Sequence, residues 1–392
     1  MLKNRIKNLP PLLLVLLVFL IYSNVIGAPF IFDDLRYIVD NAFLRDLSNF
    51  YSFGGTRYVV FLSFAVNYAI GGLSPAGYHL VNIAIHALNS VLVFFLIRAL
   101  FHTPACSSGA GGAAGRAVPG FQVAFVTALV FAAHPMETEA VAYVSQRFAS
   151  LVALFYLLAI YCYISSRLKF LDRKRGAGFA LFAAAFISAL IAQKAKETAF
   201  TLPAVILLVE FLFFQRAVFS LKNGGRLALP FLALLAVIPL ALFHPLGTAS
   251  QAGIAQTLRH FQLEELATLS RSDYLFTEFT VLVTYIRLLF FPVGQRGDYD
   301  YALYHSFFNA AVFFSFVFLA IIFIVAVYLV IRSARSKRVF GLMAGFGLLW
   351  FFIIISIESS IVPIKDVIFE HRVYLPSAGV FLSLTSLYFY LA

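Results

Sequence analysis

Long apolar runs, each about as long as a bilayer core is thick, recur along almost the whole chain. Within these runs the apolar residues are continuous and do not alternate with polar ones, which predicts helices and argues against a membrane β-barrel. We therefore predict an all-α polytopic membrane protein with about 10–11 transmembrane helices. The predicted spans cover residues 9–27, 79–101, 121–133, 148–166, 177–193, 198–215, 227–243, 306–331, 339–357 and 373–392.

The composition supports this prediction, because 62% of the residues are apolar and only 12% are charged. A soluble protein of this size could not bury so much apolar surface, which excludes a soluble enzyme, a disordered tail and a coiled coil. The net charge of +11 fits a membrane protein with basic cytoplasmic loops, so we predict no nucleic-acid partner. Cys106 and Cys162 predict no disulfide framework.

Basic residues predict which side of the membrane each loop faces. Three of them precede the first run, which is long for a signal peptide, so we expect an uncleaved first span that starts in the cytoplasm. The stretch 274–291 contains Glu278 and Arg287. If this stretch does not cross, nearly every charge in the inner loops is basic. We therefore predict ten crossings, with 274–291 as an interfacial or re-entrant segment.

Most of the unusual polar residues fall in the predicted outer loops, 28–78 and 245–305, and in shorter outer turns. The inner loop 102–120 is rich in Gly and Ala, which is typical of a flexible cytoplasmic linker. The sequence has no Walker motif, no GxGxxG and no zinc-type spacing of His and Cys. We therefore expect a site on the outer face without a nucleotide.

Two adjacent acids, Asp33 and Asp34, lie just beyond the first span. They could be solvated loop acids or could cap the next helix. Alternatively, one of them could act as a base or a metal ligand, because partial desolvation at the membrane surface raises the pKa of a carboxylate. The following stretch, 57–70, predicts an amphipathic interfacial helix that begins at Arg57 and ends at Gly71.

His79, Asn82 and His86 have a spacing that places them on one face of a helix. Polar residues within a span usually face the bundle interior, so hydrogen bonds between helices are one interpretation, above all for His86. His79 lies nearest the outer surface and could reach Asp34 or a substrate.

A polar segment around residues 134–147 precedes the next span. His134 opens it, and Glu137 is explained by the preference of a helix N-terminus for acids. Glu139, Tyr143 and Arg147, four residues apart, predict one polar stripe. Arg147 could bind a phosphate or a carboxylate through its planar guanidinium, or its charge could simply reach the membrane surface.

Two further outer turns carry cations. Lys194, Lys196 and Glu197 lie in a very short connection, where the cations could meet a lipid headgroup or Lys196 could pair with Glu197. His371 and Arg372 lie at the outer start of the last span, and Arg372 could bind the same anion.

Five segments in order resemble the transmembrane and TPR-repeat-containing O-mannosyltransferase family and, more broadly, GT-C-fold glycosyltransferases. Between residues 29 and 380 they read FDD, RYVVFLSFAVNYAIGGLSPAGYHLVNIAIHALN, HPMETEAVAYVSQRFASLVALF, KETAFTLP and EHRVYLPS. The family's TPR array is absent from this chain, so we expect either a short member or part of a longer protein.

The resemblance implies one GT-C-like domain over residues 1–392 and an inverting transfer of a mannose-like sugar from a polyprenyl-phosphate donor to a protein Ser or Thr hydroxyl. The base matches Asp34 or Asp33, and we choose Asp34. The donor phosphate matches Arg147, Lys196 and Arg372. The site could also be lined by His79, His134, Glu139, Glu197 and His371. Metal dependence varies among such enzymes, which leaves a divalent metal open, and we assign no other cofactor.

The expected partners are the polyprenyl-phosphate-sugar lipid, a protein or glycan acceptor, and membrane lipid. We expect a multi-pass protein whose active site faces the periplasm or lumen, in a bacterial inner membrane. One alternative is a lipid-linked-sugar transferase that acts on a glycan or lipid. Another is a flippase or transporter of polyprenyl-linked anions, although the sequence has no internal repeat of the kind common in transporters.

Overall fold

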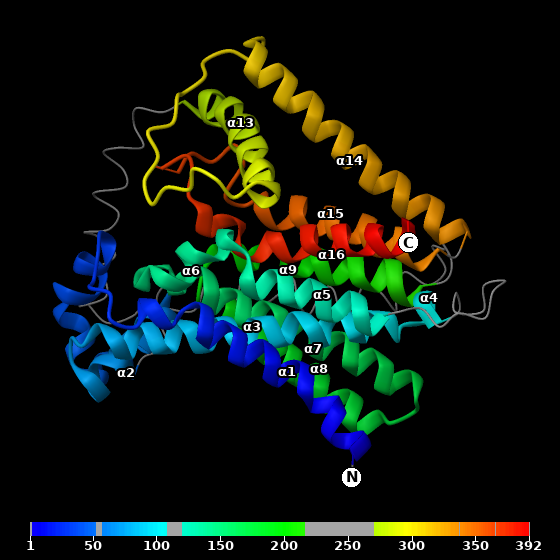
Figure 1. Cartoon of the computed structure of the whole chain (residues 1–392), viewed down its shortest axis with the longest axis horizontal. Coiled ribbons are helices and arrows are strands. Elements are labelled where there is room, and N and C mark those ends of the chain that lie inside the picture. The colour runs from blue at the N-terminus through cyan, green and yellow to red at the C-terminus, as the bar shows by residue number, and fades with distance from the viewer. Residues whose placement is uncertain are drawn as a thin grey trace.

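The computed structural model describes residues 2–51, 57–107, 120–215, 270–336, 338–364 and 366–391. Within these ranges the chain forms helices and no strand, which confirms the all-α prediction. Most of the long helices lie side by side in one bundle (Figure 1). They are α1 Leu2–Ile21, α3 Pro75–Phe101, α5 Gly120–Ala133, α7 Arg147–Leu171, α8 Arg175–Gln193, α9 Leu202–Val209, α15 Val339–Ile355 and α16 Tyr374–Leu391. Helix α14, Ala310–Ser336, runs obliquely to the bundle and contacts α15 and α13, Arg271–Phe290 (Figure 1).

Six of the described helical stretches are long and apolar enough to cross a membrane: Pro75–Phe101, Val144–Leu171, Arg175–Gln193, Glu197–Phe214, Ala310–Ser336 and Glu370–Leu391. Shorter apolar helices cover Leu9–Ile21, Tyr58–Gly71, Gly120–Ala133 and Val339–Ile355. Nine of the ten predicted spans fall on these two sets, and the tenth, 227–243, lies outside the described residues. The chain is therefore a multi-pass membrane protein.

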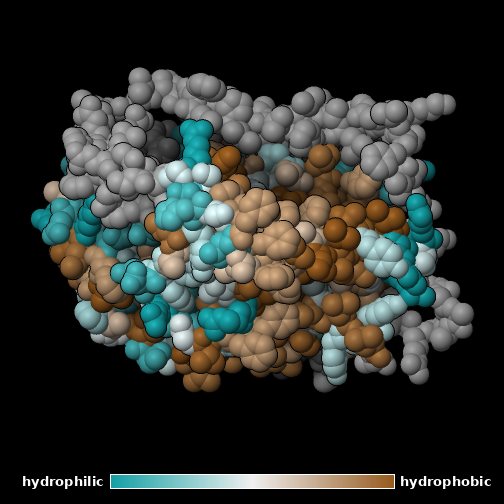
Figure 2. Space-filling model, turned by 90° about the horizontal axis from the view of Figure 1, so that it is seen from above, coloured by the Kyte–Doolittle hydropathy of each residue, from teal (hydrophilic) through white to brown (hydrophobic). Residues whose placement is uncertain are grey.

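The surface supports a membrane environment. Figure 2 shows a broad apolar area on one face, with polar residues mostly toward its two ends. Only 17% of the most apolar stretch of α14 is buried inside the protein, and its Phe314 and Ile324 side chains are exposed. Exposed apolar helices of this length suit a hydrocarbon solvent and would be costly in water.

Helix α13, Arg271–Phe290, lies in the stretch whose crossing the sequence leaves open. The segment after it runs back along the same helix. Tyr301 shares a hydrogen bond with Thr284 at 3.0 Å, and the Tyr304 N–H donates to Thr277 at 3.0 Å. The start of α14 is thereby returned toward the start of α13, and in Figure 1 both lie at the same end of the bundle. This hairpin supports the prediction of an interfacial or re-entrant segment.

The bundle packs around α3, which contacts α1, α5 and α7, while α16 packs against α15, α5 and α7. Helices α15 and α16 approach closely where Gly347 meets Gly379, because a Cβ on either residue would collide with the backbone of the other. Ser383 also donates to the Ala344 carbonyl across this contact at 2.8 Å. Small residues at such crossings let membrane helices pack tightly.

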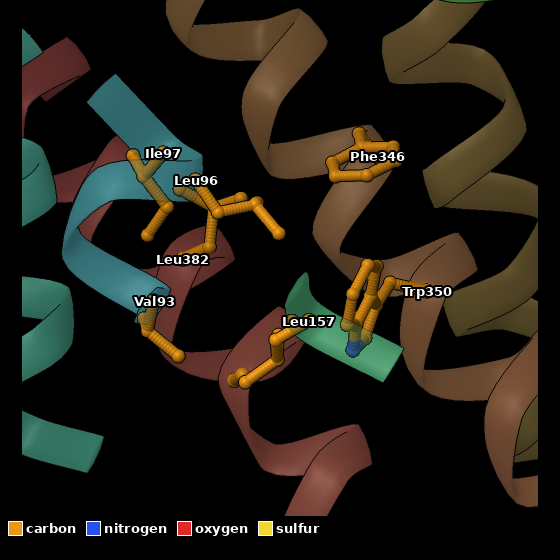
Figure 3. Close-up of a pocket in the computed structure, with 9 residues that line it drawn as sticks. Val93, Leu96, Ile97, Leu157, Phe346, Trp350 and Leu382 are labelled. Atoms are coloured by element: carbon orange, nitrogen blue, oxygen red, sulfur yellow. The ribbon is translucent and has the colours of Figure 1, made fainter. Parts of the chain in front are cut away.

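A small cavity of about 20 Å³ lies between α3, α7, α15 and α16 (Figure 3). Its lining is apolar and includes Val93, Leu96, Leu157, Phe346, Trp350 and Leu382. It has room for about one water molecule and offers almost no polar partner, so it is a packing defect and no substrate site. Trp350 in this lining donates its indole N–H to the Leu375 carbonyl at 3.0 Å.

Candidate active site at one end of the bundle

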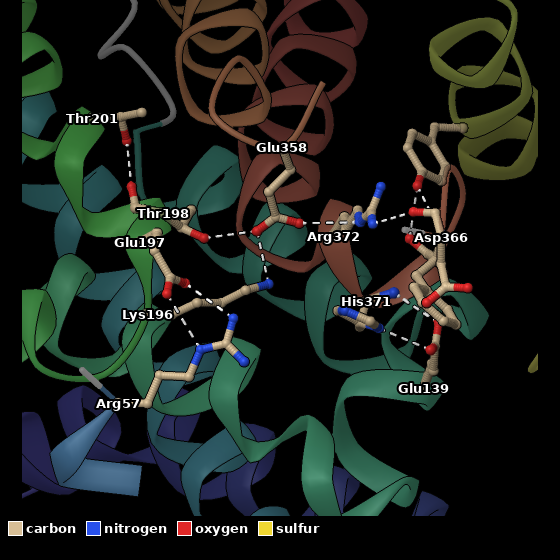
Figure 4. Close-up of polar contacts among 12 residues, drawn as sticks. Arg57, Glu139, Lys196, Glu197, Thr198, Thr201, Glu358, Asp366, His371 and Arg372 are labelled. Carbon is tan, nitrogen blue, oxygen red and sulfur yellow. Dashed lines mark hydrogen bonds and ion pairs between the residues drawn. The ribbon is translucent and has the colours of Figure 1, made fainter. Parts of the chain in front are cut away.

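Two of the three cations predicted to meet a phosphate converge on one carboxylate. Lys196 precedes the short helix η7, Glu197–Thr201, and Arg372 lies in η10, Glu370–Val373. The Lys196 ammonium lies 2.7 Å from one oxygen of Glu358, and the Arg372 Nε lies 3.5 Å from the other. Glu358, in the segment after α15, therefore stands between the two cations (Figure 4).

The protein holds Arg372 from several sides. Its guanidinium donates to the carbonyl of Val367 at 3.0 Å and to that of Asp366, and it lies over the Phe369 ring. Burial by itself would raise the pKa of Glu358, but the charges of Lys196 and Arg372 lower it to about 2. Glu358 is therefore ionised and keeps both cations in place.

His371, which we expect near the site, is clamped by Glu139. Its ring Nδ1 lies 2.8 Å from one carboxylate oxygen, and its backbone N–H donates to the other at 2.8 Å. Its ring also stacks on Phe369, with centroids 5.1 Å apart. Glu139 lies in α6, Thr138–Ala142, and His371 lies in η10, so this pair joins α6 to the segment just before α16.

Glu197 pairs with Arg57 at 3.3 Å, whereas Lys196 pairs with Glu358. The interpretation in which Lys196 pairs with Glu197 is therefore wrong. Lys196 has an extended backbone, with φ −160° and ψ 154°, and side chains that follow one another in an extended chain point to opposite sides.

The two adjacent acids have different surroundings. Asp34 is buried, and its two carboxylate oxygens accept hydrogen bonds from the backbone N–H groups of Ser145 at 2.6 Å and Ile31 at 3.1 Å. Burial raises the pKa of Asp34, although these hydrogen bonds oppose the rise. The Asp33 side chain is exposed, and its backbone N–H donates to the Tyr143 hydroxyl at 2.8 Å. Asp34 thus fixes the loop, and Asp33 presents a carboxylate at the surface.

Helix α6 connects this acidic loop to the region of the ionic cluster, by which we mean Lys196, Arg372, Glu358 and Glu278. Glu139 near its start holds His371, and Tyr143 just after its end holds Asp33. The Tyr143 N–H donates to the Glu139 carbonyl at 3.2 Å, so the residues that hold the loop and His371 lie close together. Tyr37 gives a second connection between the loop and the cluster. The charges of Asp33 and of Arg57, the partner of Glu197, both act on the Tyr37 hydroxyl.

Arg147, the third predicted phosphate-binding cation, has a different environment. It is completely buried and donates to the side-chain oxygens of Asn82 at 2.6 Å and Asn67 at 2.7 Å, and to the Tyr78 carbonyl at 3.0 Å. It thereby fastens α2, Tyr58–Gly71, and α3 to α7. These contacts do not bring Arg147 to Lys196 and Arg372, and its charge does not reach the surface.

The predicted polar stripe of Glu139, Tyr143 and Arg147 is wrong. Helix α6 ends at Ala142, Tyr143 is extended with ψ 110°, and α7 starts only at Arg147. The helical spacing is lost, so the three side chains meet three different partners. Helix α2 also departs from its prediction, because its polar Asn67 faces inward to Arg147 while its apolar Ile70 is 83% exposed.

Histidines near this end connect neighbouring segments. His79 shares a hydrogen bond with the Ala28 carbonyl at 3.1 Å, and its charge interacts with that of Asp34. His134 contacts the Leu289 carbonyl at 3.2 Å and so ties the end of α5 to α13. His86 lies 2.7 Å from the Tyr374 hydroxyl, which confirms hydrogen bonding between helices for that residue.

The sequence predicts no site role for three buried glutamates of this region. Glu358 and Glu278 belong to the cluster. The signal for Glu358 is an acid at the end of an apolar run, and the signal for Glu278 is an acid inside one. Glu137 is buried rather than only capping a helix: it accepts a hydrogen bond from Ser377 at 2.7 Å, and burial raises its pKa well above the ordinary value. Among the described residues, no three His, Cys, Asp or Glu side chains are grouped as a metal site.

The fold and this site define a multi-pass helical membrane protein with a buried ionic cluster and an exposed acid at the same end of the bundle. The chain is similar to protein O-mannosyl-transferases, which confirms the resemblance to that family. It is 33% identical to Tmtc1 of Drosophila melanogaster over 201 residues, which are 47% of this chain and 21% of that protein. It is 35% identical to TMTC2 of Homo sapiens over 160 residues, 37% of this chain and 17% of that protein.

An O-mannosyl-transferase of Caenorhabditis elegans, F38B6.6, is 29% identical over 178 residues, 41% of this chain and 24% of that protein. The matched part of the chain thus covers about a fifth of the length of these relatives. No family model matches the chain. No solved structure matches it either.

Proposed function

We propose that this protein is an inverting glycosyltransferase that moves mannose from a polyprenyl-phosphate donor to a Ser or Thr hydroxyl of a protein. The observation that carries the proposal is the meeting of Lys196 and Arg372 at Glu358. The exposed acid Asp33 is linked to this site indirectly, because Tyr143 holds Asp33 and Glu139 holds His371, the neighbour of Arg372. The similarity to proteins named O-mannosyl-transferases supports the choice of sugar and acceptor. We place the reaction on the periplasmic or lumenal face.

The two cations would bind the donor phosphate and stabilise the charge that develops as it leaves. Glu358 orients both of them and lowers the net charge of the cluster. Arg372 is almost fully buried, while the Lys196 side chain is 11% exposed. A phosphate would therefore approach past Lys196 and reach Arg372 last. Arg147 has no part in this scheme, because its donors are engaged by neutral partners.

We propose Asp33 as the base, with Asp34 as the residue that positions its loop. A base must reach the proton it removes, and the Asp33 carboxylate is exposed whereas that of Asp34 is held by two N–H groups. The acceptor oxygen attacks the anomeric carbon as Asp33 takes its proton. The bond from that carbon to the phosphate oxygen breaks, and the electron pair leaves with the phosphate. One displacement gives inversion without a glycosyl-enzyme.

The test is incubation of the purified protein with labelled polyprenyl-phosphate-mannose and membrane extract. We expect label in protein, linked to Ser or Thr, and none with Asp33→Asn. Label found instead in a lipid or free glycan would show that the enzyme acts on a glycan or lipid acceptor and not on a protein. Movement of labelled donor across vesicles without any labelled product would identify a flippase and refute the transferase.

A further inference from the structure

Glu278 is the acid of the ionic cluster that the proposed mechanism does not use. It lies on α13 and is only 1% exposed. No described residue donates to either of its carboxylate oxygens with regular hydrogen-bond geometry, although the nearby Ser359 and Tyr274 hydroxyls lower its pKa slightly. Buried polar groups are normally hydrogen-bonded, and a buried ionised carboxylate without donors is costly. This arrangement therefore needs an explanation.

The groups that face Glu278 come from three segments. Arg372 in η10 places its Nη1 4.0 Å from the Glu278 Oε1, which is too far for a hydrogen bond. Glu358, after α15, binds the same guanidinium, and Tyr274 lies one turn earlier on α13. Burial raises the pKa of Glu278 to about 7, even though the charge of Arg372 lowers it. The group can therefore hold or release a proton near neutral pH.

The charge balance of the cluster indicates when Glu278 should carry a proton. Lys196 and Arg372 balance Glu358 and an ionised Glu278, so the empty cluster is neutral. The phosphodiester of the donor adds one negative charge, which a buried site tolerates poorly. A proton on Glu278 restores neutrality, and it leaves Lys196 and Arg372 free to compensate both Glu358 and the phosphate.

We propose that Glu278 carries a proton while the donor phosphate occupies the cluster, and that it gives this proton to the phosphate as the sugar leaves. The inference rests on the proposed function and adds a general acid to it. A phosphate oxygen bound to the Arg372 Nη1 would lie beside the Glu278 Oε1, because these two atoms are 4.0 Å apart.

The proton balance closes over one cycle. When the sugar–oxygen bond breaks, the phosphate gains a second negative charge and accepts the proton of Glu278 as a new O–H bond. Asp33 holds the proton of the acceptor hydroxyl and releases it to water. Glu278, now ionised beside Arg372, takes up a proton from water when the next donor binds.

The test is calorimetric binding of a non-hydrolysable phosphonate analogue of polyprenyl-phosphate-mannose at pH 8, in two buffers with different heats of ionisation. We expect the unmodified protein to take up close to one proton per analogue, and Glu278→Gln to take up almost none while binding more tightly at this pH. Glu210→Gln is the matched control: Glu210 is also buried but pairs with Arg167, remote from the cluster, and proton uptake should persist.

Equal proton uptake by the unmodified protein and Glu278→Gln would overturn the role of Glu278 and leave the transferase proposal standing. A failure of the unmodified protein to bind the analogue would overturn both. In turnover assays kcat/KM should fall above pH 7, because the empty cluster then holds Glu278 ionised. Glu278→Gln should lower kcat more than it changes KM and remove that fall, and Glu278→Asp should restore it. A Glu278→Gln variant whose activity still falls above pH 7, as in the unmodified protein, would also contradict the proposal.

Discussion

Two buried arginines of this protein, Arg147 and Arg372, differ in the partners that surround them. Arg147 is held by neutral amide and carbonyl oxygens at 2.6 to 3.0 Å. Arg372 also donates to backbone carbonyls, but its ionic partners Glu358 and Glu278 stand at 3.5 and 4.0 Å. A guanidinium whose acceptors are all close and neutral is a structural clamp. A guanidinium that also has looser carboxylate partners can exchange these carboxylates for the oxygens of an anionic ligand.

Asp33 and Asp34 show the same contrast, because Asp34 is fixed by hydrogen bonds and Asp33 is available to a substrate. The largest expected effect is therefore on turnover when Asp33 is replaced. Asp33→Asn should lower turnover roughly 10²–10⁴-fold, because it removes the basic oxygen and keeps the size of the side chain. Asp34→Asn should mainly lower thermal stability, because its amide has one oxygen to accept the two backbone N–H groups. Turnover and unfolding of both variants decide this, and reversed effects would make Asp34 the base.

Replacement of Arg147 should lower the stability of the protein and leave the turnover of the folded molecules unchanged. Arg147→Lys loses the planar set of donors and leaves several buried oxygens unpaired, which we expect to cost about 3–5 kcal/mol. The measurement is thermal unfolding in detergent, together with turnover per folded molecule. A stable Arg147→Lys protein that has lost donor binding would return Arg147 to the phosphate site.

Replacement of the cations at Glu358 should affect turnover more than stability. Arg372→Ala and Lys196→Ala should each lower turnover by roughly 10²–10³-fold, as expected for the loss of one group that stabilises developing charge. Arg335→Ala, an exposed cation at the far end of α14, is the control and should be neutral. If both cluster variants keep normal turnover, the phosphate binds elsewhere.

The ion pairs of Glu358 predict a dependence of stability on pH. Its pKa is lowered to about 2 in the folded protein from an ordinary value of 4.5, so its contribution is present above pH 4.5 and is lost as the pH falls toward 2. By linkage this contribution is about 3 kcal/mol at neutral pH, and more than half of it is lost by pH 3. The difference in unfolding free energy between the unmodified protein and Glu358→Gln, measured from pH 7 to pH 3, should shrink accordingly. A constant difference would show that the Gln variant acts through packing.

The smallest effect is expected for the pair of Arg57 and Glu197. Their side chains are 31% and 41% exposed, and exposed ion pairs contribute about 0–1 kcal/mol. Glu197→Gln should therefore change the unfolding temperature by only a few degrees. A loss of stability as large as that expected for Arg147→Lys would show that the pair of Arg57 and Glu197 contributes as much as a buried interaction.

Much of the fold could be read from the sequence, because long apolar runs in lipid have few options other than a helix. Charge also separates the two ends of the bundle, which is why Lys196 and Arg372 could be picked as neighbours of one anion. Glu278 in an apolar helix was visible as an unusual residue, but nothing in the sequence showed that its oxygens face Arg372 without a hydrogen bond.

Only the tertiary structure decided which charge meets which partner. Lys196 and Glu358 are 162 positions apart, and Asp34 and Ser145 are 111 apart, so their contacts depend on how the helices pack. The break between α6 and α7 turns Glu139, Tyr143 and Arg147 in different directions, although their spacing would align them on a continuous helix. Spacing determines a helix face only while the helix continues, and packing determines what that face contacts.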